Sequence, residues 1–186
     1  MSKVYVFLAN GMEEVECLTV VDLLRRGEVE VVMVSITDTK EVVGSHNITI
    51  VADECIEHLA TEERLIKDAD LLFLPGGMPG TQNLKSNEML ASMLKEQVNA
   101  KKLVGAMCAA PSVLGNLHLL EGKRATCYPG FENELLGATC VTDHVVIDGN
   151  VITARGLGYA VELGLTLLSI LEGEEVANRV KNSIFA

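Results

Sequence analysis

A single thiol stands where an apolar strand pattern passes into a helical pattern. Residues 103–115 read LVGAMCAAPSVLG, so Cys108 ends an apolar run and Pro111 suits the first turn of a helix. The free N–H groups at a helix N-terminus are expected to stabilise a thiolate there and to lower its pKa. This order of strand, nucleophile and helix is that of a nucleophile elbow, although the usual Gly-x-Ser-x-Gly string is absent. The alternative is a core cysteine, because free cysteines are commonly buried.

An acidic side chain on the first predicted helix, Glu16, is the second candidate. Within residues 11–27 it lies on the face that carries the apolar side chains, so its carboxyl group is expected to be partly buried. Burial raises the pKa of a carboxyl group and favours the protonated form, which donates a hydrogen bond. The alternative is an ordinary acid at a helix N-terminus, a position that Glu13 and Glu14 fit better than Glu16 does.

A glycine pair follows another apolar run, in the string LPGGMPG at 74–80. Gly76 and Gly77 can form a simple tight turn, or they can aim a backbone N–H group at a developing negative charge. Ligands of parallel sheets bind beyond the carboxyl ends of the strands, where both this turn and Cys108 are predicted. Next to Cys108, the turn would supply half of an oxyanion hole.

Short apolar runs alternate along the chain with helical patterns. The predicted elements are strands at 4–9, 29–36, 71–77 and 103–108, hairpins at 40–52 and 145–154, and helices at 11–27, 87–102, 111–120, 158–173 and 174–184. This alternation predicts an α/β fold with a mostly parallel sheet covered on both faces. No Pro- or Ser-rich linker divides the 186 residues, so a single domain over 1–186 is expected.

Composition argues against several kinds of partner and cofactor. The net charge of −11 disfavours nucleic acid and anionic membranes, and no apolar run approaches the ~20 residues of a membrane span. The N-terminus lacks a signal-peptide pattern, so a cytoplasmic location is expected. The five cysteines form no CxxC pair and the histidines lie far from them, so neither a disulfide framework nor a zinc site is predicted. Val161 interrupts the one glycine-rich string that resembles a dinucleotide fingerprint.

Several strings of the chain occur together in one known superfamily. They are GMEEVE at 11–16, LPGGMPG at 74–80, AMCAAPSVL at 106–114 and RGLG at 155–158. On these strings the chain resembles the ThiJ/PfpI superfamily over almost its full length, in the branch of the parkinsonism-associated deglycase. The resemblance implies a flavodoxin-like three-layer sandwich, of the class I glutamine amidotransferase type, built as one ThiJ/PfpI domain that forms homodimers.

The resemblance also implies roles for individual residues. Cys108 matches the reactive, oxidation-prone cysteine, and Glu16 matches the acid that hydrogen-bonds its sulfur. Gly77 and Ala109 match the backbone N–H donors that face the site. The pocket around them is expected to hold Gly76, Tyr128, Pro129 and Gly156. No metal and no cofactor is implied.

The chain departs from the superfamily pattern at several positions near the site. Tyr128 precedes Pro129 where many members have His-Pro, Leu157 replaces a common proline, and His46 stands near a position often held by arginine. Without that histidine a Cys-His dyad lacks its base, which disfavours an intracellular peptidase. Cys127, which precedes Tyr128, is a candidate disulfide partner of Cys108 under oxidation.

Two functions from different classes fit these residues. In the first, the chain is a cofactor-independent glyoxalase or protein deglycase of the lyase or hydrolase type, acting against carbonyl and oxidative stress. Cys108 then adds to a small aldehyde such as methylglyoxal or glyoxal, or to a glycated substrate, and Glu16 moves the proton. In the second, the chain is a redox sensor or holdase chaperone in which Cys108 is oxidised to a sulfinate. The sequence does not separate the two.

Overall fold

Seven strands form the central sheet of the computed structural model, which describes residues 1–61 and 68–186. The order across the sheet is β10-β11-β7-β6-β1-β2-β5. The strands are β1 (Lys3–Leu8), β2 (Glu30–Ser35), β5 (Glu54–Cys55), β6 (Leu71–Leu74), β7 (Leu103–Met107), β10 (Val145–Asp148) and β11 (Val151–Ala154). Neighbouring strands are parallel except for the β10–β11 hairpin.

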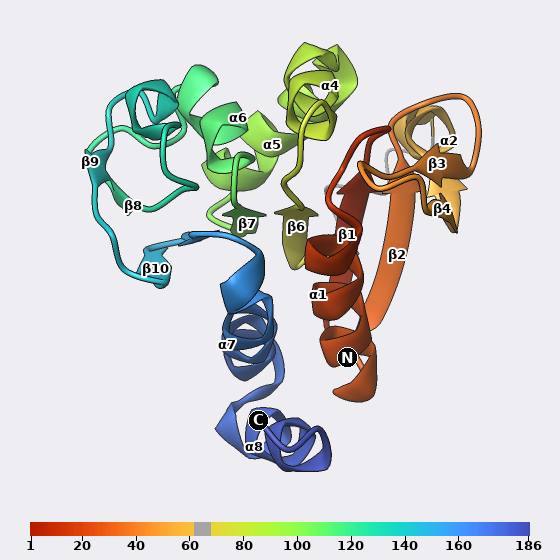
Figure 1. Ribbon diagram of the computed structural model, residues 1–186, viewed down its shortest axis with the longest axis vertical. Coiled ribbons are helices and arrows are strands. Elements are labelled where there is room, and N and C mark those ends of the chain that lie inside the picture. Colours follow the sequence, from red (N-terminus) through yellow and green to blue (C-terminus); the bar gives the residue numbers. More distant parts are fainter. Residues whose placement is uncertain (62–67) are drawn as a thin grey trace.

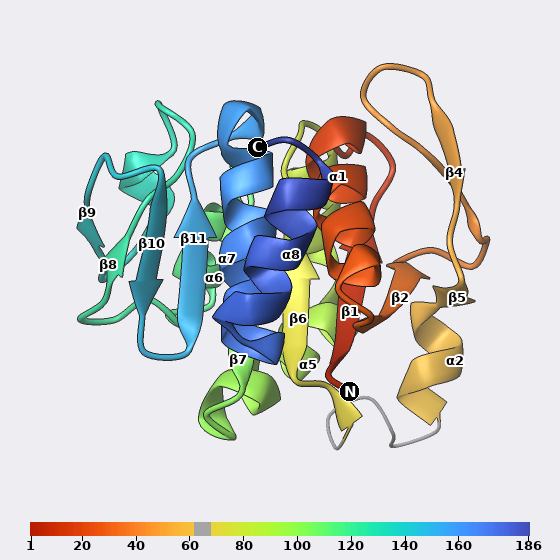
Figure 2. The same ribbon diagram turned by 90° about the horizontal axis from the view of Figure 1, so that it is seen from below.

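Helices cover both faces of this sheet, as Figures 1 and 2 show. One face carries α1 (Glu14–Arg26), α7 (Ala160–Glu172) and α8 (Glu174–Ser183), and the other carries α2 (Ile56–Thr61), α4 (Gly80–Ser86), α5 (Glu88–Asn99) and α6 (Pro111–Asn116). The central strands are apolar without alternation because each of their faces packs against a helical layer; all four residues of β6 are buried. Two separate hydrophobic cores result, one on each side of the sheet.

A small hairpin outside the central sheet packs against the residues that precede α1. It consists of β3 (Glu41–Val43) and β4 (Thr49–Val51), which pair antiparallel. The N–H of Gly11 donates to Val43 O at 2.8 Å, and the N–H of Ser45 donates to Met12 O at 2.7 Å. These bonds fix the hairpin tip beside the N-terminus of α1. On the opposite side of the molecule, β8 (Arg124–Ala125) and β9 (Thr139–Cys140) form a second two-stranded sheet.

The predicted α/β fold with a mostly parallel sheet and a helical layer on each side is confirmed. Two short helices, α2 and α4, were missed; α4 has the sequence GTQNLKS, whose single apolar side chain gives no periodic signal. The helix predicted at 111–120 ends at Asn116, and the helix predicted at 11–27 begins at Glu14. The start of α1 is set by Glu13, whose side chain accepts a 2.6 Å hydrogen bond from the N–H of Glu16.

No helix in the described ranges is both long and apolar enough to cross a lipid bilayer.

Candidate active site

The candidate residues meet at the carboxyl ends of three neighbouring strands. Glu16 lies in the first turn of α1, which follows β1; Gly76 follows β6; and Cys108 follows β7 directly. β1 and β6 are neighbours, although the chain runs outward through β2 and β5 before it returns. The site therefore lies at the switch point of the sheet, where open α/β folds bind their ligands.

Cys108 occupies a tightly held turn between β7 and α6. Its φ of +60° is in the left-handed region, which non-glycine residues rarely adopt. The N–H of Cys108 donates to Ala154 O at 2.9 Å, and Cys108 O accepts from the N–H of Tyr128 at 2.8 Å. Such a backbone persists only where the surroundings enforce it, and it commonly marks a functional position. The geometry is that of a nucleophile elbow, with a thiol that is only partly buried.

The glycine pair is required by close packing around the thiol. A Cβ atom on Gly76 would lie 2.5 Å from the Cβ of Cys108 and 2.7 Å from Oε2 of Glu16. Gly77 has a φ of +89°, and a Cβ atom there would lie 2.2 Å from the backbone nitrogen of Glu13. Any side chain at these positions would separate the sulfur, the carboxyl group and the turn.

Glu16 is a buried carboxyl group in contact with the thiol. Only 1% of the residue is exposed, and Oε2 accepts a 3.0 Å hydrogen bond from the N–H of Gly76. Burial raises the pKa of Glu16 to about 7, while hydrogen bonds to Cys108, to Gly76 and to the backbone of Leu157 oppose the rise. The direction agrees with the sequence-based expectation, and it places the carboxyl group where it can both accept and release a proton near neutral pH.

The thiol of Cys108 does not have the lowered pKa that the sequence predicted. Burial and the nearby Glu16 carboxylate raise the pKa of Cys108 to about 12, and hydrogen bonds from the N–H groups of Gly77 and Ala109 offset this only in part. The prediction failed for two reasons: α6 has only six residues, and the carboxyl group lies beside the sulfur. A thiol paired with a carboxylate needs a base to remove its proton, and Glu16 is in place to be that base.

The expected pocket residues contact this pair to different degrees. One edge of the Tyr128 ring lies near Gly156, where an added Cβ atom would lie 3.3 Å from Cδ2 of the ring. Tyr128 is 51% exposed, and Pro129 beside it is also exposed. Cys127 is buried and carries a free thiol, so its pairing with Cys108 under oxidation stays a prediction.

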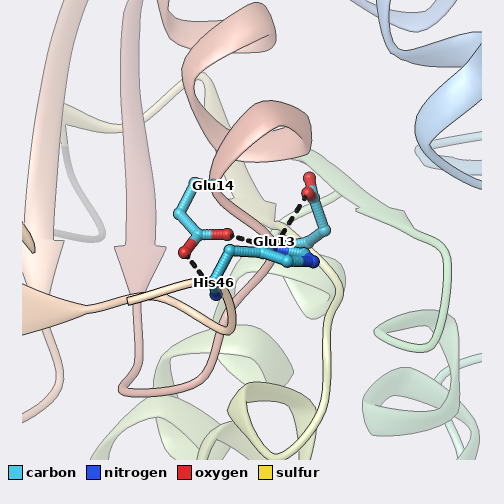
Figure 3. Close-up of side chains that lie close together, drawn as sticks. All are labelled: Glu13, Glu14 and His46. Carbon is cyan, nitrogen blue, oxygen red and sulfur yellow. Dashed lines mark hydrogen bonds and ion pairs between the residues drawn. The ribbon is translucent and has the colours of Figure 1, made fainter. Parts of the chain in front are cut away.

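A cluster of charged side chains beside the site was not found from the sequence. Glu13 and Glu14 stand at the start of α1, and His46 reaches them from the tip of the β3–β4 hairpin (Figure 3). Glu14 is 2% exposed; its Oε1 accepts from the backbone N–H of His46 at 2.7 Å, and its Oε2 lies 2.9 Å from Nδ1 of the same residue. The only sequence signal was the pair of adjacent acids, which also suits an ordinary helix start.

These three residues have the composition of a metal site but a different use. Nδ1 of His46 also lies 3.8 Å from Oε1 of Glu13, whose other oxygen caps α1. Both oxygens of Glu14 accept hydrogen bonds from the hairpin. Because the oxygen and nitrogen atoms that could bind a metal already hold two segments together, we assign this cluster a structural role as a latch between hairpin and helix.

The latch is expected to weaken as the pH rises above neutrality. Burial alone would raise the pKa of Glu14, but hydrogen bonds from His46 lower it to about 2, and the Glu14 carboxylate raises the pKa of His46. The ordinary pKa values are 4.5 for Glu14 and 6.5 for His46, so the ion pair is at full strength between pH 4.5 and pH 6.5. At higher pH the pair is lost as His46 loses its proton. We expect the hydrogen-exchange protection factor of the His46 amide to fall as the pH rises above 6.5 and through the raised pKa of His46. The amide at position 46 in His46→Asn should show no such fall; an equal fall in both proteins would contradict the latch.

Comparison with known proteins places these features in one family. The model of the DJ-1/PfpI family matches residues 2–170. The chain is 38% identical over 184 residues to Protein DJ-1 homolog B of Arabidopsis thaliana. The alignment covers 98% of the chain and 41% of that relative, so the chain spans less than half of the plant protein's length. It is 33% identical over 168 residues to the glutathione-independent glyoxalase DJR-1.2 of Caenorhabditis elegans, covering 89% of the chain and 86% of the relative. The oxidized DJ-1 structure of Toxoplasma gondii superposes with a TM-score of 0.93 at 32% identity, covering 100% and 98% of the two chains.

Proposed function

Because the chain belongs to the DJ-1/PfpI family, we propose that it is a cysteine-dependent glyoxalase or protein deglycase that acts on small 2-oxoaldehydes such as methylglyoxal and glyoxal. The observation that carries the proposal is the contact between a partly buried thiol and a buried carboxyl group whose pKa is about 7. The similarity to a relative named as a glutathione-independent glyoxalase supports it. Protein deglycation would form the same sulfur–carbon bond on an adduct of the aldehyde, with the amine or thiol of the glycated protein leaving as the bond forms.

The first step joins the thiol to the aldehyde carbon. As the sulfur–carbon bond forms, the thiol proton moves to the Glu16 carboxylate, which makes the sulfur nucleophilic only when substrate is present. The N–H groups of Gly77 and Ala109, which already contact the sulfur, lie beside the new oxyanion and stabilise it. Glu16 then returns its proton to that oxygen, and a neutral hemithioacetal results.

The later steps are an internal redox exchange followed by hydrolysis. Glu16 removes the proton from the former aldehyde carbon and delivers it to the neighbouring carbonyl carbon through an enediol, while the hydroxyl proton of the hemithioacetal passes to the oxygen of that carbonyl group. The first carbon is oxidised to a thioester while the second is reduced to an alcohol, so no outside oxidant or reductant takes part. Water then releases the 2-hydroxy acid and restores the thiol. For methylglyoxal the sum is one aldehyde and one water giving one lactate.

The proposal is tested by turnover of methylglyoxal without glutathione. Purified protein is expected to convert methylglyoxal to lactate, followed as loss of the aldehyde and as lactate formed. The initial rate of methylglyoxal consumption must equal the initial rate of lactate formation. Consumption alone is not sufficient, because lysine, arginine and cysteine side chains also react with the aldehyde. Loss of aldehyde without lactate would reject the glyoxalase.

A second candidate function uses the same thiol as a redox sensor or as the switch of a holdase chaperone. Hydrogen peroxide would oxidise Cys108 in two steps to a sulfinate, with one water released for each peroxide consumed. The specific observation in its favour is the Glu16 carboxyl group beside the sulfur, whose raised pKa lets the protonated form donate to a sulfinate oxygen. The similarity to an oxidized DJ-1 structure supports it as well.

We further propose that the protein forms a homodimer through the exposed face of α1. Val15 and Leu18 are exposed apolar residues there, and with Ile48 and Phe185 they line a surface groove of about 560 Å³. Leu18→Glu should convert a species of twice the 20.0 kDa chain mass to the monomer in light scattering, because it buries a charge at the contact. The similarly exposed Leu136→Glu is the control. A wild-type protein that scatters as a monomer would reject the dimer.

A further inference from the structure

We propose that Tyr128 makes this site selective for uncharged 2-oxoaldehydes that carry an aromatic or extended apolar substituent. The inference rests on the proposed function, and it adds the substrate class and the residue that selects it. Tyr128 stands where a base is expected for acyl transfer, and the structure shows what the ring does instead.

The backbone of Tyr128 is hydrogen-bonded to the backbone of Cys108. Its N–H donates to the carbonyl of Cys108 at 2.8 Å, so the two residues are joined directly. One edge of the ring lies close to Gly156, where an added Cβ atom would be 3.3 Å from Cδ2 and 3.9 Å from Cε2. The residue is 51% exposed. The ring is therefore held near Gly156 along one edge, and its exposed part can contact a ligand.

Two other exposed apolar residues are sequence neighbours of the glycines at the site. Met78 comes directly after Gly77, and it is 50% exposed. Leu157 comes directly after Gly156; its backbone hydrogen-bonds Glu16, and the residue is 47% exposed. The segments that hold the thiol and Glu16 thus carry half-exposed thioether, leucine and phenol groups, which suit a ligand whose apolar substituent contacts one or more of them.

The charges around the thiol act against anionic substrates. The charged groups that influence Glu16 and Cys108 are carboxyl groups, those of Glu13 and of Glu16 itself. No basic side chain is among the main causes of these two pKa shifts. His46 is held by Glu14, and Arg155 donates to Thr142 O at 3.1 Å. A 2-oxo acid would bring its carboxylate next to these acids without a paired cation, whereas a neutral 2-oxoaldehyde would not.

The test compares phenylglyoxal and methylglyoxal as substrates. We expect kcat/KM for phenylglyoxal to exceed that for methylglyoxal about fivefold, the effect of one aromatic contact. Glyoxylate has no second carbonyl group to reduce, so it is used only in the alkylation measurement below. Because the aldehydes also differ in intrinsic reactivity, the decisive value is the change in the phenylglyoxal-to-methylglyoxal ratio on mutation. Tyr128→Ala should lower this ratio about fivefold, and Tyr128→Phe, which keeps the ring, should preserve it. Ile147→Ala removes a similarly exposed apolar side chain from β10 and should leave the ratio unchanged.

A second measurement separates this inference from the proposed function. Each carbonyl compound protects Cys108 from brief alkylation by iodoacetamide, mapped by mass spectrometry, if it forms the hemithioacetal. Stronger protection by phenylglyoxal that depends on the ring of Tyr128 supports the selectivity even in a protein that forms no lactate, in which case only the glyoxalase proposal fails. Lactate formation with a ratio that Tyr128→Ala does not change overturns the selectivity and leaves the glyoxalase standing. Protection by glyoxylate equal to that by methylglyoxal also overturns it.

Discussion

Cys108→Ser is expected to lower methylglyoxal turnover at least ~1,000-fold, the size of loss seen when a nucleophile is removed. The hydroxyl group is smaller than the thiol and fits the same turn. It is far less nucleophilic, however, and a base with a pKa of about 7 cannot ionise it appreciably. The measurement is the initial rate of lactate formation by wild-type and variant protein at equal concentration.

The matched control for this substitution is Cys140→Ser. Cys140 is exposed, at the end of β9, and its thiol donates a 3.6 Å hydrogen bond to Glu132 O rather than taking part in the site. Its replacement should leave lactate formation unchanged. Equal loss in both variants would mean that a general property of thiols, such as trapping of the aldehyde, had been measured. Retention of activity by Cys108→Ser would exclude covalent catalysis by this residue.

Part of the arrangement of the site could be predicted from the sequence because Gly76 and Cys108 follow strand ends. Apolar runs locate the ends of β6 and β7, and the parallel arrangement brings these ends to one edge of the sheet. The contact of the thiol with Glu16, in the first turn of α1, was expected from the family resemblance and not from the topology.

The remaining features of the site depend on contacts between distant residues. The Glu14–His46 latch joins positions 32 apart through a hairpin whose docking no local pattern specifies. The position of the Tyr128 ring near Gly156 likewise requires the structure. The pKa of Cys108 was predicted in the wrong direction because a helix N-terminus is visible in a sequence, whereas the burial of a thiol against a carboxylate is a tertiary effect.

Glu16→Gln is expected to lower methylglyoxal turnover ~100- to 10,000-fold, the range for loss of a general acid–base group. The amide keeps the size of the side chain and a hydrogen-bond donor, but it cannot accept the thiol proton. Glu16→Asp keeps the acid and shortens its reach by one methylene group, so its loss should be smaller. In the wild-type protein, kcat/KM should rise with pH and level off above about 7, as the Glu16 carboxylate forms. That step should be absent from the Gln variant.

The same two variants separate the enzyme from the redox sensor. The Glu16 carboxylate is one of the causes that raise the pKa of Cys108, so Glu16→Gln should lower that pKa and increase the fraction of thiolate. Peroxide oxidation depends on thiolate, and the amide can still donate to a sulfinate oxygen, so sulfinate formation should persist in the Gln variant. It should fall in the Asp variant, whose shorter side chain donates to that oxygen with poorer geometry. Turnover should follow the opposite order, with the Asp variant above the Gln variant.

In Glu16→Gln the thiol should ionise more readily although lactate formation is lost. This combination would show that catalysis requires proton transfer by Glu16 and not only a supply of thiolate. If neither variant changes the thiol pKa, the turnover or the oxidation product, Glu16 is only an acid at a helix start.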